Sequence, residues 1–170
     1  MTIDEVVAAA RGNPPMVHCL TATVSMSLVA DGLLAAGLRP MMTETLEEAP
    51  VVVTAADALS VNLGTLSTDG MVGIPATVAA RPDGVPWVLD PTAIGLAPVR
   101  TRMARDFLDE GPDVVKGNAS EILALAGLAA GGRGVDTTDT AVSALPAAQA
   151  LARQTGAVVA VTGEVDYVTD

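Results

Sequence analysis

Short apolar runs alternate with longer segments of helical period along the whole of this 170-residue sequence. The runs that predict strands are MVHCL, RPMMT, ALSVNLG, PWVLD, DVVKG and AVVAVT. Residues 23–37 give the clearest helix, because hydroxyl residues precede an apolar pattern of helical spacing and Gly37 ends it. Strands separated by helices are typical of βαβ units. The sequence therefore predicts an α/β fold with a mostly parallel central sheet.

The other predicted helices follow the remaining strands at regular intervals. They cover residues 43–56, 68–84, 97–111, 119–128 and 141–156. In the first of these Pro50 interrupts the pattern, although Glu44, Glu47 and Glu48 favour an N-terminal turn there. Residues 129–140 form a Gly- and Thr-rich loop. The length fits a single domain, and the composition shows no linker.

Charge and composition exclude several classes of partner. The net charge of −11 with no basic cluster argues against nucleic acid. No segment approaches the ~18 continuous apolar residues of a membrane span, and the acidic N-terminus is unlike a signal peptide. Cys19 is the only cysteine, which rules out an internal disulfide framework. We therefore expect a cytoplasmic protein that binds neither nucleic acid nor membrane.

Polar residues and glycines gather where the predicted strands end. They are His18, Thr21, Thr43, Asn62, Gly64, Asp90, Lys116, Asn118 and Thr162. In a parallel sheet, ligands bind in the crevice beyond the carboxyl ends of the strands. The pattern indicates a binding crevice, although each residue taken singly fits equally well as a cap or turn residue. His18 and Cys19 are neighbours and face opposite sides of a strand, so a buried structural histidine fits better than a catalytic pair.

Two acidic residues are the strongest candidates for chemistry. Pro91 keeps Asp90 extended at a strand end, and Glu121 follows Asn118 at the spacing of a capping box. Helix capping alone explains Glu121, but two carboxylates beside Lys116 also suit a hydrated Mg²⁺ that holds phosphate oxygens. Thr162 with the following glycine either binds a phosphate oxygen or forms a tight turn. Taken together these residues predict phosphoryl transfer.

Several longer stretches carry a resemblance to a known family. MVHCLTATVSMSLVADGLLAAG, ADALSVNLGTLS, VLDPTAIG, KGNASEILALAG, GGRGVD and VAVTGEVDYVTD occur in the order and spacing of hydroxyethylthiazole kinases. The resemblance implies a three-layer α/β/α ribokinase-like fold with helices on both faces of the sheet. It also implies transfer of the γ-phosphoryl group of ATP to the hydroxyl of 4-methyl-5-(2-hydroxyethyl)thiazole, with Mg²⁺, in thiamine biosynthesis or salvage. Members of this family are typically homotrimers with sites at subunit interfaces.

The resemblance also implies a role for individual residues. It places Asp90 and Glu121 near Mg²⁺, Lys116 and Thr162 on the ATP phosphates, and Val24, Met42 and Gly64 around the thiazole. Lys116 stands where many members have Arg, which replaces a bidentate fork by a point charge. Ala22 stands where the family usually has Asn, so a related kinase, such as one for hydroxymethylpyrimidine, is an alternative.

The resembling stretches run to the last residue, whereas family members continue into a Gly-rich loop. That loop carries the residue next to the substrate hydroxyl and an anion hole for the transferred group. We therefore expect residues 1–170 to form one ribokinase-like domain that is incomplete at its C-terminus, and we assign no catalytic residue within it. We expect this chain alone to be inactive. The alternative is a non-catalytic thiazole-binding or assembly module.

Overall fold

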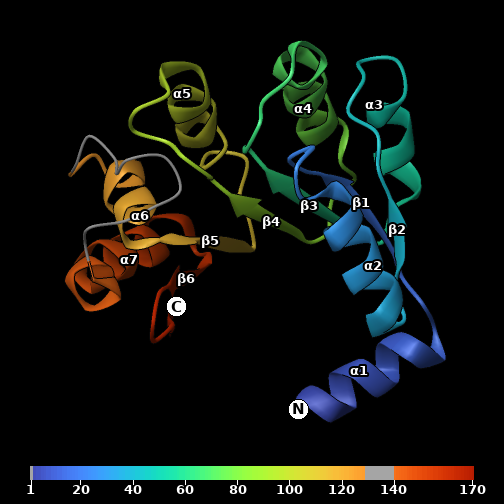
Figure 1. The fold of residues 1–170 in the computed structure, drawn as a ribbon, viewed down its shortest axis with the longest axis horizontal. Helices are drawn as coiled ribbons and strands as arrows, with labels where there is room; N and C mark the ends of the chain where they lie inside the picture. The colour runs from blue at the N-terminus through green and yellow to red at the C-terminus, as the bar shows by residue number, and fades with distance from the viewer. Residues whose placement is uncertain (1, 129–139) are drawn as a thin grey trace. The chain divides into compact units, whose positions relative to one another are not determined.

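The computed structural model describes residues 2–128 and 140–170, which form two compact units. The first unit consists of Met1–Val61 and Thr65–Pro86, and the second of Asn62–Gly64 and Trp87–Asp170. Figure 1 labels the helices and strands of both. Each unit is a parallel or mostly parallel sheet with helices that connect its strands, so each is an α/β structure in its own right.

In the first unit, β1 lies between β2 and β3, and all of its strand pairs are parallel. The strands are β1 (Met16–Leu20), β2 (Arg39–Met41) and β3 (Ala58–Asn62). The helices are α1 (Ile3–Gly12), α2 (Met26–Ala36), α3 (Ala49–Val52), which continues as the 3₁₀ turn η1 (Val53–Ala55), and α4 (Thr68–Ala80). Helices α3 and α4 pack side by side (Figure 1). Leu20, Leu59 and Val61 are buried in its core.

In the second unit, the strand order is β4-β5-β6-β7, with β7 antiparallel to β6 and the other pairs parallel. The strands are β4 (Trp87–Asp90), β5 (Val114–Asn118), β6 (Val158–Thr162) and β7 (Tyr167–Thr169). The helices are α5 (Pro98–Asp106), α6 (Ala119–Leu125) and α7 (Ala141–Thr155). Helices α6 and α7 pack side by side (Figure 1), over a core that includes Val115, Ile122 and Val159.

The predicted strands are all present, and the mostly parallel α/β fold is confirmed. Two elements were not predicted, namely α1 and β7. A signal for α1 exists in the sequence, because Thr2 and Glu5 form a capping box: the Thr2 amide donates to Glu5 Oε2 at 2.7 Å and the Glu5 amide donates to Thr2 Oγ1. The predicted loop at residues 129–140 lies outside the described residues except for Thr140, which caps α7.

The helix predicted over residues 43–56 is much shorter in the structure. It begins only at Ala49, with Pro50 in its first turn. Proline fits that position because the first N–H groups of a helix have no intrahelical partner. Pro50 therefore lies in the first turn of the helix, and the prediction that it interrupts one is wrong. Glu44, which was expected to favour the N-terminus of this helix, instead accepts a hydrogen bond from Ser67 at the start of α4.

Among the helices of residues 2–128 and 140–170, none has the length and apolar character needed to cross a bilayer. Many of the buried residues are alanines, as in α7, where Ala144, Ala147, Ala148 and Ala152 are buried. Small side chains let this helix lie close to β6. A chain with few aromatic residues thus fills its core by close approach of the backbone elements.

Candidate functional site

A polar crevice of about 290 Å³ lies in the second unit at the ends of its strands. It is lined by Asn62, Asp90, Thr92, Lys116, Asn118, Glu121 and Thr162. Asp90, Asn118 and Thr162 are the last residues of β4, β5 and β6, which explains why distant parts of the sequence meet there. Four residues predicted for the site, Asp90, Lys116, Glu121 and Thr162, are therefore brought together.

Asp90 is held from two sides by hydrogen bonds. Lys116 Nζ donates to its Oδ2 at 2.9 Å, and the Thr92 hydroxyl donates to its Oδ1 at 2.7 Å. Thr92 in turn accepts from Asn62 Nδ2 at 2.9 Å, while Asn62 Oδ1 accepts from the Gly64 amide. Because a backbone amide only donates, the bond from Gly64 fixes the orientation of the Asn62 side-chain amide. Each hydrogen bond of the series then donates in the direction of Asp90. Both oxygen atoms of the Asp90 carboxyl group thus act as hydrogen-bond acceptors.

Glu121 is buried, and both of its carboxylate oxygens accept backbone hydrogen bonds. Oε2 accepts from the Asn118 amide at 2.8 Å, which completes the predicted capping box, and Oε1 accepts from the Ala93 amide at 2.8 Å. Burial raises the pKa of Glu121, and the two backbone hydrogen bonds offset part of that increase. Ala93 has a φ of 59°, so Glu121 also stabilises a left-handed residue in the loop after β4. Capping is therefore only one of its roles.

The donor set of the crevice suits a hydrated magnesium ion. Asp90, Glu121, Asn62 and Thr162 offer oxygen atoms, the ligands that Mg²⁺ prefers. Within the described part of the chain, no three or more His, Cys, Asp or Glu residues are grouped as a metal cage. An ion held here would accordingly keep several of its waters, which is the usual behaviour of Mg²⁺ bound through one or two carboxylates and substrate phosphates.

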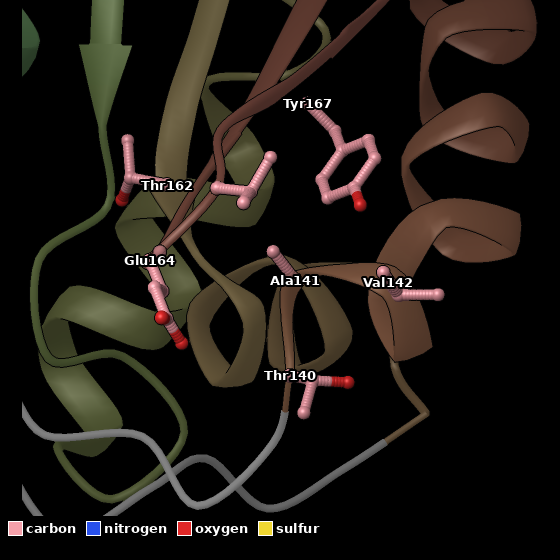
Figure 2. Close-up of a pocket in the computed structure, with 8 residues that line it drawn as sticks. Thr140, Ala141, Val142, Thr162, Glu164 and Tyr167 are labelled. Atoms are coloured by element: carbon pink, nitrogen blue, oxygen red, sulfur yellow. The ribbon is translucent and has the colours of Figure 1, made fainter.

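A second cavity of about 310 Å³ lies on the other side of Thr162, between the β6–β7 hairpin and the first turn of α7 (Figure 2). Its lining residues are Thr140, Ala141, Val142, Thr162, Gly163, Glu164, Val165 and Tyr167. Figure 2 shows the Tyr167 ring extending from the hairpin toward this turn, with the Thr162 hydroxyl turned away from the ring. Thr162 thus borders both cavities. The contribution from the start of α7 was not predicted, because residues 129–140 separate this helix from the preceding strand in the sequence.

The residues predicted to surround a thiazole are divided between the units. Val24, which is 87% exposed, precedes α2, and the half-buried Met42 follows β2, both in the first unit. Gly64 belongs to the second unit, where it is buried and donates to Asn62. Ala22 is buried and accepts from the Ser25 amide and hydroxyl. The grouping of Val24, Met42 and Gly64 around one ligand stays a prediction.

His18 and Cys19 do not form a nucleophile and base. His18 is fully buried in β1, and its Nε2 lies 2.8 Å from the Thr43 carbonyl oxygen. Burial lowers the pKa of His18 and raises the pKa of Cys19 to about 11, so the imidazole is neutral and the thiol is protonated at pH 7. The prediction of a buried structural histidine is confirmed.

Comparison with known proteins gives one consistent family. The model of the hydroxyethylthiazole kinase family matches residues 7–170. A hydroxyethylthiazole kinase of Klebsiella pneumoniae subsp. pneumoniae is 55% identical over 161 residues, which cover 94% of this chain and 63% of that protein. One from Citrobacter koseri is 57% identical over 157 residues, covering 92% of this chain and 60% of the relative.

Solved structures agree on the fold. The structure of a hydroxyethylthiazole kinase protein from Pyrococcus horikoshii OT3 superposes with a TM-score of 0.82 and 36% identity, over 98% of this chain and 62% of that chain. A Staphylococcus aureus pyridoxal kinase bound to pyridoxal reaches a TM-score of 0.67 at 17% identity, which supports the ribokinase-like fold alone. The chain thus spans 60–63% of the length of these hydroxyethylthiazole kinases.

Proposed function

Because the chain belongs to the hydroxyethylthiazole kinase family, we propose that the protein transfers the γ-phosphoryl group of ATP to the hydroxyl of 4-methyl-5-(2-hydroxyethyl)thiazole. The observation that carries this proposal is the crevice in which Asp90, Lys116, Glu121 and Thr162 meet. Phosphoryl transfer needs little covalent work by a protein and depends on positioning and on neutralising negative charge. The crevice brings the Lys116 ammonium group and the carboxylates of Asp90 and Glu121 to one sheet edge. Such a set of groups can both position phosphates and neutralise their charge.

We assign the phosphate-binding roles to Lys116 and Thr162. The Lys116 ammonium group is 2.9 Å from Asp90 Oδ2, which holds this positive charge at the mouth of the crevice. Asp90 and Glu121 are the residues that would hold a hydrated Mg²⁺, which would neutralise charge on the phosphate oxygens when bound. Thr162 presents a hydroxyl donor at the end of β6, where the two cavities meet.

The cavity beside Thr162 is the site that we propose for the nucleoside part of ATP. It is large enough for a substantial part of a nucleoside, and Val142, Val165 and Tyr167 give it an apolar wall. Because Thr162 borders both cavities, a nucleotide with its phosphates in the crevice would place its sugar and base beside the β6–β7 hairpin. This proposal assigns the start of α7 to nucleotide binding.

For the acceptor we propose Val24, Met42 and Gly64, the residues that match the thiazole-binding positions of the family. The alternative acceptor is hydroxymethylpyrimidine, because Ala22 supplies no side-chain amide after β1.

We further propose a cytoplasmic homotrimer. The buried free thiol of Cys19 fits a reducing compartment. Helix α2 is largely apolar but none of its residues is buried, which fits a surface that another subunit covers.

The experiment is a turnover assay on an extended chain, in which the C-terminal portion of the Klebsiella pneumoniae relative follows residue 170. ATP consumption is measured with the thiazole alcohol and, separately, with hydroxymethylpyrimidine. We expect saturable turnover with the thiazole, its retention in Lys116→Arg, and a loss of about 10²-fold or more in Lys116→Met. Preference for the pyrimidine would replace the proposed acceptor, and a folded chimera with no turnover on either alcohol would refute the kinase assignment.

A further inference from the structure

The segment of residues 42–44, which carries Met42, is held from several sides within the first unit. His18 in β1 contacts the Thr43 carbonyl oxygen at 2.8 Å. The Thr43 hydroxyl donates to Glu48 Oε2 at 3.1 Å. These contacts hold the backbone and the side chain of the residue that follows Met42. These two hydrogen bonds restrain the position of the irregular segment.

Helix α4 holds the other end of the segment. The Ser67 hydroxyl, at the helix N-terminus, donates to Glu44 Oε1 at 2.6 Å and accepts from the Gly70 amide at 2.8 Å. One turn further along, Gly73 lies directly against the Glu44 backbone, and a Cβ atom at that position would overlap the Glu44 carbonyl oxygen. The segment is thus fixed between β1 and α4.

The hydrogen bond from His18 differs from the others because the side chain that makes it is completely buried. His18 is 0% exposed, and its Nδ1 atom has no hydrogen-bond partner among the described residues. Leaving a buried ring nitrogen without a partner is unfavourable. An apolar side chain would avoid that cost, so packing alone does not account for a histidine at this position. What the imidazole supplies is a donor that reaches the Thr43 carbonyl.

We propose that His18 is a positioning residue for the acceptor alcohol, because its Nε2–H group holds the Thr43 carbonyl and thereby fixes Met42. The inference rests on the proposed function, in which Met42 contacts the thiazole. His18 touches neither the substrate nor the phosphates in this account. Its substitution therefore weakens binding of the alcohol while binding of the nucleotide, which uses the second unit, is unchanged.

The test uses two substitutions of nearly equal length in the 170-residue chain. His18→Gln keeps an N–H donor at the position of Nε2, whereas His18→Met removes it. Affinities for the thiazole alcohol and for ADP with Mg²⁺ are measured by calorimetry, and folding is checked by circular dichroism. We expect His18→Met to weaken alcohol binding by about tenfold or more, His18→Gln to restore it, and ADP affinity to stay constant.

Thr54→Ala is the control, because it removes an exposed hydrogen bond to the Val51 carbonyl in the first unit and leaves residues 42–44 untouched; alcohol affinity should match that of the wild type. Equal alcohol affinity in wild type and His18→Met overturns the inference, as does a parallel loss of ADP affinity, which would indicate general loosening. If the wild type binds ADP but not the alcohol, the acceptor assignment itself fails, and the inference with it.

A measurement on the unaltered protein keeps the inference testable even where His18→Met does not fold. Nitrogen-15 NMR of the imidazole distinguishes its two neutral tautomers. Donation to a carbonyl oxygen requires the proton on Nε2, so we expect the Nε2–H tautomer at pH 7. A spectrum showing the proton on Nδ1 would overturn the proposal whatever the variants do.

Discussion

At the scale of the residue, buried polar side chains in this protein bind backbone groups of neighbouring loops. His18 in β1 contacts the Thr43 carbonyl in the segment after β2, and Glu121 in α6 accepts from the Ala93 amide in the loop after β4. Both side chains are buried, and burial shifts their pKa values in the direction that favours the neutral form. Burial therefore affects the protonation equilibrium of both side chains.

The protonation of His18 gives a prediction for stability against pH. Its native pKa lies below the ordinary value of 6.5, so the unfolded chain binds the proton more readily than the native chain does. The stability that wild type gains from a neutral His18 is present above pH 6.5 and is lost as pH falls through the lowered native pKa. His18→Gln does not titrate and lacks this dependence.

The measurement is the difference in unfolding free energy between wild type and His18→Gln, from urea titrations between about pH 5 and pH 8. We expect the unfolding free energy of the wild type to fall relative to that of His18→Gln as pH decreases, by at most about 1.4 kcal/mol per pH unit. Subtracting the variant cancels the contribution of the carboxylates. A difference that stays constant over this range would contradict a lowered pKa for His18.

Ala93 gives a second prediction at this scale. Its φ of 59° is the left-handed region, which costs a residue with a Cβ about 1–2 kcal/mol. Ala93→Gly removes this strain but gives the unfolded chain more freedom, so we expect a net gain in unfolding free energy of roughly 0.5–1 kcal/mol. The control Ala150→Gly, at an exposed position in α7, should lose a similar amount. Destabilisation by both substitutions would show that Ala93 is unstrained.

At the scale of the element, α4 shows how a helix fixes a neighbouring irregular segment. Its N-terminus is capped by Ser67, whose hydroxyl also donates to Glu44. In its middle, Gly73 permits contact with the Glu44 backbone. Thr77 donates its hydroxyl to the Gly73 carbonyl of the preceding turn, which satisfies a buried polar group inside the helix. The helix thus sets the path of residues 42–44.

The contact at Gly73 predicts opposite effects for two Gly→Ala substitutions in helices. Ala normally stabilises a helix relative to Gly by roughly 0.5–1 kcal/mol. At Gly73 the new methyl group would overlap the Glu44 backbone, so we expect a loss of about 3 kcal/mol. At Gly32 in α2, where the space around the added atom is open, we expect the ordinary gain.

Urea denaturation of both variants, followed by circular dichroism, gives the two free energies. Since Gly32 and Gly73 lie in the same unit, unfolding of that unit is compared in both cases. A neutral or stabilising Gly73→Ala would mean that α4 can move away from residues 42–44, and would remove one side of the support described for Met42.

At the scale of the whole molecule, the chain covers 63% of a Klebsiella pneumoniae hydroxyethylthiazole kinase. The matched part contains the residues that we assign to the phosphates, to Mg²⁺ and to the acceptor. The resemblance places the anion hole and the group beside the substrate hydroxyl in the part that relatives carry beyond the match. We therefore propose that binding and chemical transfer depend on different portions of such a protein.

This division predicts the activity of residues 1–170 tested alone. Loss of a single preorganised oxyanion donor typically lowers a rate by ~10²–10³-fold, so we expect a polypeptide limited to residues 1–170 to turn over at least that much more slowly than the chimera. We expect no thiazole-dependent ATP consumption above background from the 170-residue chain, in contrast to the chimera with the Klebsiella pneumoniae C-terminal portion. Saturable phosphorylation of the thiazole by residues 1–170 would show that the transfer machinery lies within them.

The sequence by itself determined the order of strands and helices, because a period of two or of 3.6 residues is a local property. It also placed Asp90, Lys116, Glu121 and Thr162 at strand ends, since parallel strands bring their carboxyl ends to one edge. Family resemblance supplied the roles of these residues. The capping box of α1 and the place of Pro50 in the first turn of α3 were equally local, but their signals were missed or misread.

Only the tertiary structure decided which groups satisfy one another across elements. The hydrogen bond from His18 to Thr43, that from Ala93 to Glu121, and the contact of Gly73 with Glu44 join residues that no local period relates. The cavity between α7 and the β6–β7 hairpin arises in the same way. Such pairings depend on how elements pack, because a buried donor or acceptor takes whichever partner the fold brings within reach.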